Sequence, residues 1–68
     1  MATGTLTVGY RKNFQGARLA RKVDGKWSWF LDLDMCGKPA TFEGPPGVYR
    51  VYVKEGTIWR LDLEFTHA

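Results

Sequence analysis

The sequence predicts an all-β protein: a small five-stranded antiparallel barrel or strongly bent sheet, OB-like or SH3-like, with no long helix. Several short segments alternate polar and apolar residues, which is the period of a half-buried strand. Turn signals at Asp24-Gly25 and Glu55-Gly56 interrupt these segments in the way that β-hairpins require. No long window places apolar residues at helical spacing. Five short strands in a chain of this length are typical of a small barrel.

The composition is sufficient for one domain spanning residues 1–68. A chain of 68 residues lies near the lower limit for independent folding, so its apolar content must be dense. Hydrophobic residues make up 44% of the chain and aromatic residues 15%. Aromatic side chains bury large areas, so ten of them supply a core out of proportion to the chain's length.

The elements follow in order. Residues Thr5–Tyr10, "TLTVGY", alternate and predict a first strand. Residues 13–23 are compatible with helix or strand, but their continuity with the Asp24-Gly25 turn favours a strand, which pairs with residues 26–34. Residues 35–47 hold all three prolines and three of the eight glycines and predict a crossover loop, with room for a short edge strand at Ala40–Glu43. The remaining residues predict a second hairpin.

The register of the first hairpin decides where its tryptophans point. A two-residue turn would place Trp27 and Trp29 on one face with Arg18 and Lys22, and neither face would be purely apolar. A three-residue loop, 23–25, with a glycine bulge collects the apolar residues on one face. Burying a tryptophan outweighs the repulsion between Lys22 and Lys26 that this register creates. The same reasoning applied to a three-residue loop at 54–56 gives the expected core: Trp27, Trp29, Leu31, Val51, Trp59, Leu61 and Leu63.

This register leaves aromatic residues among cations on the outside. Phe30 lies opposite Arg18, and Tyr52 lies beside Arg50 and Arg60. Single-stranded nucleic acids are bound by this combination, because a ring stacks on a base while cations contact phosphates. Arg11 and Lys12 add an N-terminal basic arm. The predicted nucleic-acid-binding residues are Phe30, Tyr52, Arg18, Lys22, Lys26, Arg50, Arg60, Arg11 and Lys12.

The charge distribution supports an anionic partner. The chain has a net charge of +3, but residues 10–26 alone carry six cations and one carboxylate, a net +5. The predicted function is therefore non-catalytic binding of single-stranded DNA or RNA with low sequence specificity. The alternative is a small protein–protein interaction module or inhibitor, of the kind that phages and other mobile elements encode. Salt dependence separates the two, because phosphate contacts weaken steeply with salt.

The remaining expectations concern chemistry, assembly and location. One cysteine, Cys36, and one histidine, His67, cannot complete a zinc site, and the acidic pairs near 32–34 and 62–64 have no nucleophile nearby in the sequence. We therefore expect no enzyme activity, metal or cofactor. The small size and outward apolar residues predict a homodimer. No leader-like or membrane-spanning apolar run is present, which predicts a cytoplasmic protein that does not enter membranes.

Overall fold

The computed structural model describes residues 2–68, which form six β-strands and no helix. The all-β prediction is confirmed, with six strands in place of the predicted five. No helix in this range is long and apolar enough to cross a membrane. The strands are β1 (Ala2–Thr7), β2 (Phe14–Val23), β3 (Lys26–Leu33), β4 (Pro39–Gly44), β5 (Gly47–Glu55) and β6 (Ile58–His67).

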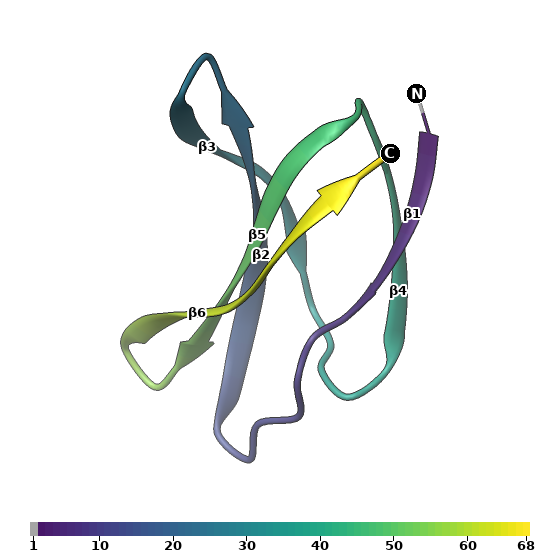
Figure 1. Cartoon of the computed structure of the whole chain (residues 1–68). Coiled ribbons are helices and arrows are strands. Elements are labelled where there is room, and N and C mark those ends of the chain that lie inside the picture. Colours follow the sequence, from purple (N-terminus) through teal and green to yellow (C-terminus); the bar gives the residue numbers. More distant parts are fainter. Residues whose placement is uncertain (1) are drawn as a thin grey trace.

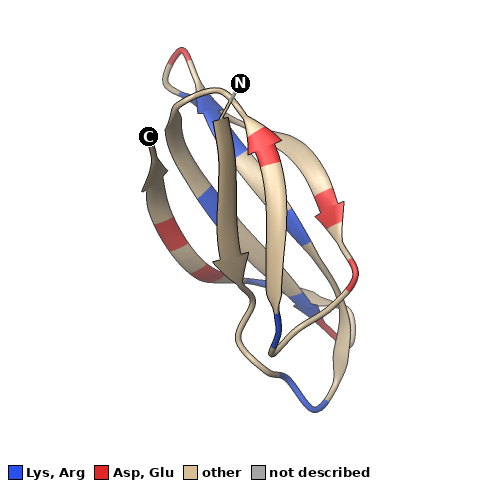
Figure 2. Ribbon diagram, turned by 90° about the vertical axis from the view of Figure 1, so that its right-hand side faces the viewer, with Lys and Arg blue, Asp and Glu red and all other residues tan. Residues whose placement is uncertain are grey.

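The strands form two antiparallel sheets. One has four strands in the order β3-β2-β5-β6, and the other pairs β1 with β4. Figures 1 and 2 show β1 and β4 side by side across one face of the larger sheet. The two sheets do not close into a single barrel, so the structure does not confirm the predicted OB-like or SH3-like architecture.

Two strand predictions need correction, and the structure resolves a third. The segment predicted as a crossover loop contains a strand, β4, which includes the short strand allowed for at Ala40–Glu43 and extends it by one residue at each end. Its first residue is Pro39, and proline is tolerated at the first position of a strand because no ladder hydrogen bond is needed from it there. The first strand begins earlier than predicted and ends at Thr7 rather than Tyr10. Residues 14–23 are a strand, β2, which lies between β3 and β5.

The first hairpin uses a two-residue turn, so the three-residue loop predicted at 23–25 is wrong. Asp24 and Gly25 both have positive φ, 51° and 79°, as a type I′ turn requires, and Val23 pairs with Lys26. The register then shifts: Ala20 pairs with Trp29, whereas Leu19 pairs with Leu31. Phe30 is the extra residue of this bulge.

The second hairpin repeats the arrangement, so the loop predicted at 54–56 is also wrong. Glu55 pairs with Ile58 across a two-residue turn in which Gly56 has φ 62°. A bulge follows in β6, because Tyr52 pairs with Leu61 whereas Val51 pairs with Leu63. Asp62 is the additional residue.

Each bulge moves the side chains beyond it to the other face of the strand. Leu31, Val51 and Leu63 belong to the core or pack against it, as predicted. The predicted burial of Trp27, Trp29, Trp59 and Leu61 is wrong, because these residues precede the bulges and point away from the second sheet. Phe30, predicted to face outward, packs against the buried ring of Tyr49 with centroids 5.7 Å apart. The predictions failed because they assumed unbroken alternation along each strand.

The core lies between the two sheets. Tyr49 is fully buried, and its hydroxyl donates a hydrogen bond to the Pro45 carbonyl at 2.6 Å. A Cβ at Gly44 would lie 2.6 Å from the Tyr49 hydroxyl oxygen, so glycine permits the close approach of β4 to β5. The buried hydrophobic residues of this cluster are Leu6, Val8, Ala17, Leu19, Leu33, Phe42, Tyr49, Val51 and Val53.

Candidate nucleic-acid interface

The candidate site is the face of the four-stranded sheet that points away from β1 and β4, hereafter the outer face. Strand pairing places its residues side by side: Lys22 is opposite Trp27, Ala20 is opposite Trp29, and Arg18 is opposite Tyr52. The outer face also carries side chains from β6, because Trp59 pairs with Lys54 and Glu64 pairs with Arg50. Its residues are Arg18, Ala20, Lys22, Trp27, Trp29, Asp32, Arg50, Tyr52, Lys54, Trp59, Leu61 and Glu64.

Aromatic rings from three strands meet at the centre of the outer face. The Trp29 ring contacts Tyr52 edge-on, with centroids 5.4 Å apart, and lies 6.0 Å from the Trp59 ring at an interplanar angle of 42°. Trp29 nevertheless remains 55% exposed and Trp59 37% exposed. These rings therefore pack against one another and still offer surface to a ligand.

Cations lie over these rings. The Arg18 guanidinium carbon is 5.4 Å from the Trp29 centroid and 5.1 Å from the Trp59 centroid. The Arg50 guanidinium lies 4.1 Å from the centroid of Trp27. Lys22 and Lys54 place their ammonium groups near 6 Å from Trp27 and Trp59, at 6.0 Å and 5.9 Å respectively. Such cation–π contacts hold the cations against these rings. The rings of Trp27, Trp29, Tyr52 and Trp59 are hereafter called the aromatic cluster.

Two carboxylates partly balance this charge. Arg18 Nε donates to Asp32 at 2.9 Å, and Arg50 Nε donates to Glu64 at 2.6 Å. The hydrogen bond to Glu64, followed by that to Tyr52, raises the pKa of Arg50. Within residues 2–68, Lys22 and Lys54 form no ion pair. Four cations against two carboxylates leave the outer face with a net charge of +2.

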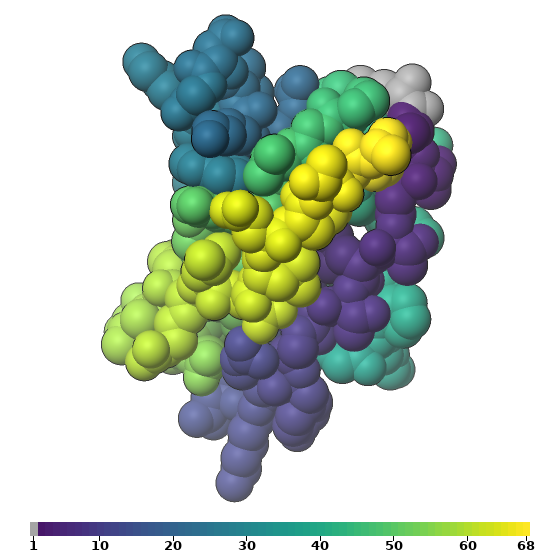
Figure 3. Space-filling model, in the orientation of Figure 1, coloured from purple at the N-terminus to yellow at the C-terminus, as the bar shows by residue number. Residues whose placement is uncertain are grey.

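Hollows lie on and beside the outer face. An apolar hollow of about 400 Å³ is lined by Ala20, Trp27, Ser28, Trp29, Tyr52 and Trp59. A more polar one of about 550 Å³ lies toward the start of β2, where Phe14, Arg18 and Asp34 are among its lining residues, and it shares Trp59. Figure 3 shows the β2–β3 and β5–β6 hairpins projecting on the side of the molecule opposite β1.

The structure brings four of the predicted binding residues together on the outer face: Arg18, Lys22, Arg50 and Tyr52. Others lie elsewhere. Phe30 turns into the core through the bulge, and Arg60 pairs with Val53 on the opposite face from Trp59. Lys26 is exposed at the hairpin tip, opposite Val23, and its side chain alternates away from that of Trp27.

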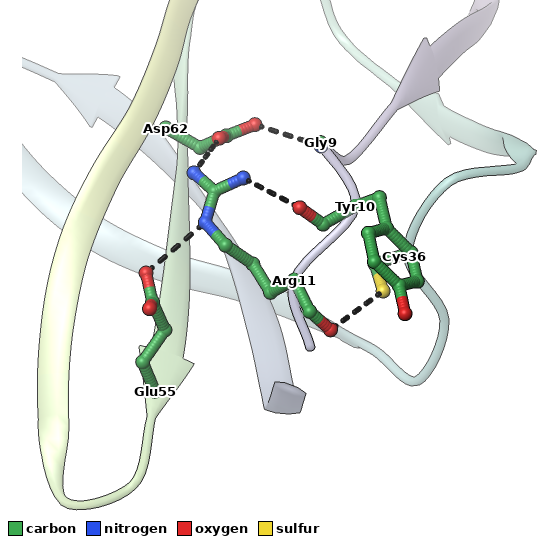
Figure 4. A network of polar contacts seen from close by, with 6 residues as sticks. All are labelled: Gly9, Tyr10, Arg11, Cys36, Glu55 and Asp62. Atoms are coloured by element: carbon green, nitrogen blue, oxygen red, sulfur yellow. Dashed lines mark hydrogen bonds and ion pairs between the residues drawn. The ribbon is translucent and has the colours of Figure 1, made fainter. Parts of the chain in front are cut away.

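Arg11 is not part of a free basic arm. Its guanidinium bonds to Asp62 and, through Nε at 3.0 Å, to Glu55, as Figure 4 shows. The hydrogen bond to Asp62 is the main reason that the pKa of Arg11 is raised. Asp62 also accepts the Gly9 N–H at 3.2 Å, so the bulge residue of β6 fastens the segment before β2. Lys12 lies exposed in the turn that precedes β2.

The sequence reasoning missed the main rings of the site, Trp27, Trp29 and Trp59, together with Lys54. One signal pointed to them. Asp-Gly is the strongest two-residue turn sequence, and the two-residue register puts both tryptophans of β3 beside Arg18 and Lys22. Without a bulge, the two-residue register mixes charged and apolar residues on both faces along the whole strand, which made it look unfavourable. The bulge limits this mixing to the half of the strand next to the turn.

The other candidate groups have structural partners. His67 is buried, and its Nε2 lies 3.1 Å from the Ala2 carbonyl oxygen. The Cys36 thiol lies 3.9 Å from the Arg11 carbonyl oxygen. In the described part of the chain, no three His, Cys, Asp or Glu residues form a cluster suited to a metal ion. Comparison with known protein families, curated proteins and solved structures finds no significant match.

Proposed function

We propose that the protein binds single-stranded DNA or RNA with low sequence specificity through the outer face. One observation carries the proposal: two partly exposed tryptophans, Trp29 and Trp59, lie side by side with the Arg18 guanidinium over both rings. Exposed rings bordered by cations match the needs of an unpaired nucleic-acid strand, whose bases stack and whose phosphates are anionic.

The low specificity follows from the chemistry of the rings. Every base has a π-face, so stacking on tryptophan or tyrosine discriminates little among bases. The polar groups of these rings are the indole N–H donors of Trp27, Trp29 and Trp59 and one hydroxyl. Tyr52 has a hydroxyl, and this group already accepts a hydrogen bond from Arg50 at 3.3 Å.

Single-strand preference follows from the same arrangement. Bases in a duplex present their π-faces to neighbouring base pairs, whereas an unpaired strand exposes them to a protein ring. The cations Arg18, Lys22, Arg50 and Lys54 border the cluster and supply phosphate contacts. Four such contacts on single strands predict a salt slope no steeper than about −3 in log K against log salt, because Arg18 and Arg50 are already paired with Asp32 and Glu64.

A titration of labelled oligo-dT and a matched duplex at two salt concentrations tests the proposal. We expect oligo-dT to bind more tightly than the duplex, and its affinity to fall by about 10- to 100-fold between ~50 mM and ~200 mM salt. Equal affinity for the duplex, or no binding of oligo-dT at low salt, would remove the proposal.

One observation favours the alternative of a protein-docking module. Ile58 and Leu61 on the edge strand β6 are 53% and 51% exposed. Exposed apolar residues on an edge strand suit contact with another protein, including a second copy of this chain, as the predicted homodimer requires. Binding of that kind responds little to salt, so the same salt comparison separates it from nucleic-acid binding.

A further inference from the structure

A small residue, Ala20, lines the apolar hollow on the outer face and is itself only 2% exposed. Along β2 the outward positions are Arg18, Ala20 and Lys22. The methyl group of Ala20 therefore lies between two long cationic side chains. Ala20 lies at the centre of the sheet, between Trp29 on β3 and Arg50 on β5. A larger side chain there would fill the space that Trp27, Trp29, Tyr52 and Trp59 now surround.

The lining and its borders differ in character. The hollow itself is mainly apolar and aromatic, and its volume of about 400 Å³ lies within the range of small-ligand sites. Charge lies at its two ends. Arg50 and Lys22 lie beside Trp27, whereas Arg18 and Lys54 lie beside Trp59. An apolar slot between two cationic ends is complementary to one flat ring with an anion on either side.

We infer that this hollow takes one unpaired nucleobase, with Ala20 beneath it, while the phosphates on the two sides of that nucleotide lie at the two cationic ends. The inference rests on the proposed function and adds a specific mode of binding. The strand does not simply lie across the aromatic cluster: one base enters it. A cationic ligand is disfavoured because the four cations around the hollow exceed the two carboxylates, Asp32 and Glu64, that pair with Arg18 and Arg50.

The lining also determines which bases enter. Stacking on indole and phenol rings accepts purines and pyrimidines alike. The polar groups of the lining are three indole N–H donors and the hydroxyls of Ser28 and Tyr52. A paired base cannot enter without leaving its partner, so the hollow adds to the preference for single strands. One base per protein is therefore the unit of recognition.

Filling the hollow tests the inference. We expect Ala20→Leu to weaken oligo-dT binding about tenfold or more and to leave the salt slope unchanged, because no cation is removed. Thr41→Leu is the matched control, since Thr41 is an exposed strand position on β4, outside the hollow. It adds the same side chain and should leave binding unchanged.

A second measurement uses the wild-type protein and two ligands. One is a hexanucleotide backbone with abasic sugars throughout, and the other is the same backbone with a single central thymine. The single thymine should raise wild-type affinity about tenfold and should not raise that of Ala20→Leu. If Ala20→Leu does not fold, Ala20→Val, which fills less of the hollow, replaces it in both measurements, because a thymine stacked on the surface rings would also raise wild-type affinity.

The outcomes distinguish the inference from the proposed function. If wild-type protein binds oligo-dT but gains nothing from the single thymine, or if folded Ala20→Leu binds oligo-dT as tightly as wild type, base insertion is wrong and surface binding stands. If wild-type protein binds no oligo-dT at low salt, both are wrong. A thymine-dependent gain that Ala20→Leu abolishes supports both.

Discussion

The two faces of the four-stranded sheet carry aromatic residues with opposite surroundings. On the inner face, Tyr49 is fully buried beneath Phe42 of the second sheet and stacks on Phe65 with centroids 5.7 Å apart. On the outer face, Trp29 packs against Tyr52 and Trp59 of its own sheet and remains 55% exposed. The larger ring is the more exposed one. The covering sheet determines which rings form the core, and ring size does not.

This contrast predicts that truncations on the inner face affect stability and truncations on the outer face affect binding. Leu19→Ala should have the largest effect, because Leu19 is fully buried at the centre of the core. We expect a loss of about 2–5 kcal/mol in the free energy of unfolding, measured by chemical denaturation. The protein that remains folded should bind oligo-dT normally. An equal loss of stability in Trp29→Ala would contradict the contrast between the faces.

Gly44→Ala should lower the free energy of unfolding, because it overpacks the core on the inner face. The new methyl carbon would lie 2.6 Å from the Tyr49 hydroxyl oxygen and 3.0 Å from the Phe30 ring. A loss of about 1–3 kcal/mol is expected. Tyr49→Phe removes the nearer of these atoms, so Gly44→Ala should cost less in that background, as a double-mutant cycle can measure. If Gly44→Ala costs the same free energy of unfolding in the wild-type and Tyr49→Phe backgrounds, the Tyr49 hydroxyl is not the reason that position 44 requires glycine.

Trp29→Ala should have its main effect on binding. Loss of one stacking ring costs about 1–3 kcal/mol in the free energy of binding single-stranded nucleic acid. The unfolding free energy should fall by no more than about 1 kcal/mol, the value of the ring contacts that Trp29 makes with Tyr52 and Trp59. Fluorescence anisotropy with labelled oligo-dT measures the first quantity. Unchanged affinity would move the binding site away from this ring.

The smallest effect comes from a matched pair of cation variants, Lys22→Ala and Arg11→Ala. Lys22 borders Trp27 on the outer face, so its loss should reduce the salt slope by about 0.7 to 1 and leave the melting temperature unchanged. Arg11 bonds to Asp62 and Glu55, so its loss should lower the melting temperature and leave the slope unchanged. If both variants reduce the slope equally, Arg11 contacts nucleic acid after all.

Much of the fold could be predicted from local pattern. The alternation of Tyr49, Val51 and Val53 places three side chains on the inner face, and all three are fully buried. Asp24-Gly25 is the turn of the first hairpin, and Glu55-Gly56 located the second to within one residue, because its turn is Gly56-Thr57. The strand β4 was harder to predict, because its pairing with β1 joins residues nearly forty positions apart and the prolines around it resemble a loop.

The candidate site was harder still, because it depends on two bulges. Phe30 and Asp62 are inserted between paired residues, and nothing in their side chains marks the insertion. One extra residue reverses every side chain beyond it. The cations Arg18, Lys22 and Arg50 were found because they lie on the paired strands, β2 and β5, that carry no bulge at those positions. The tryptophans lie on the bulged strands, so their direction was predicted wrongly.

Acrylamide quenching of tryptophan fluorescence, with and without oligo-dT, tests the central claim most directly. All three tryptophans of the chain lie on the outer face, so the emission reports on that face alone. The structure predicts efficient quenching in the free folded protein and clear protection when saturating oligo-dT is added at low salt. Weak quenching in the free protein, as for tryptophans in a core, would contradict the outward placement of the rings. Efficient quenching that oligo-dT leaves unchanged would contradict their role in binding.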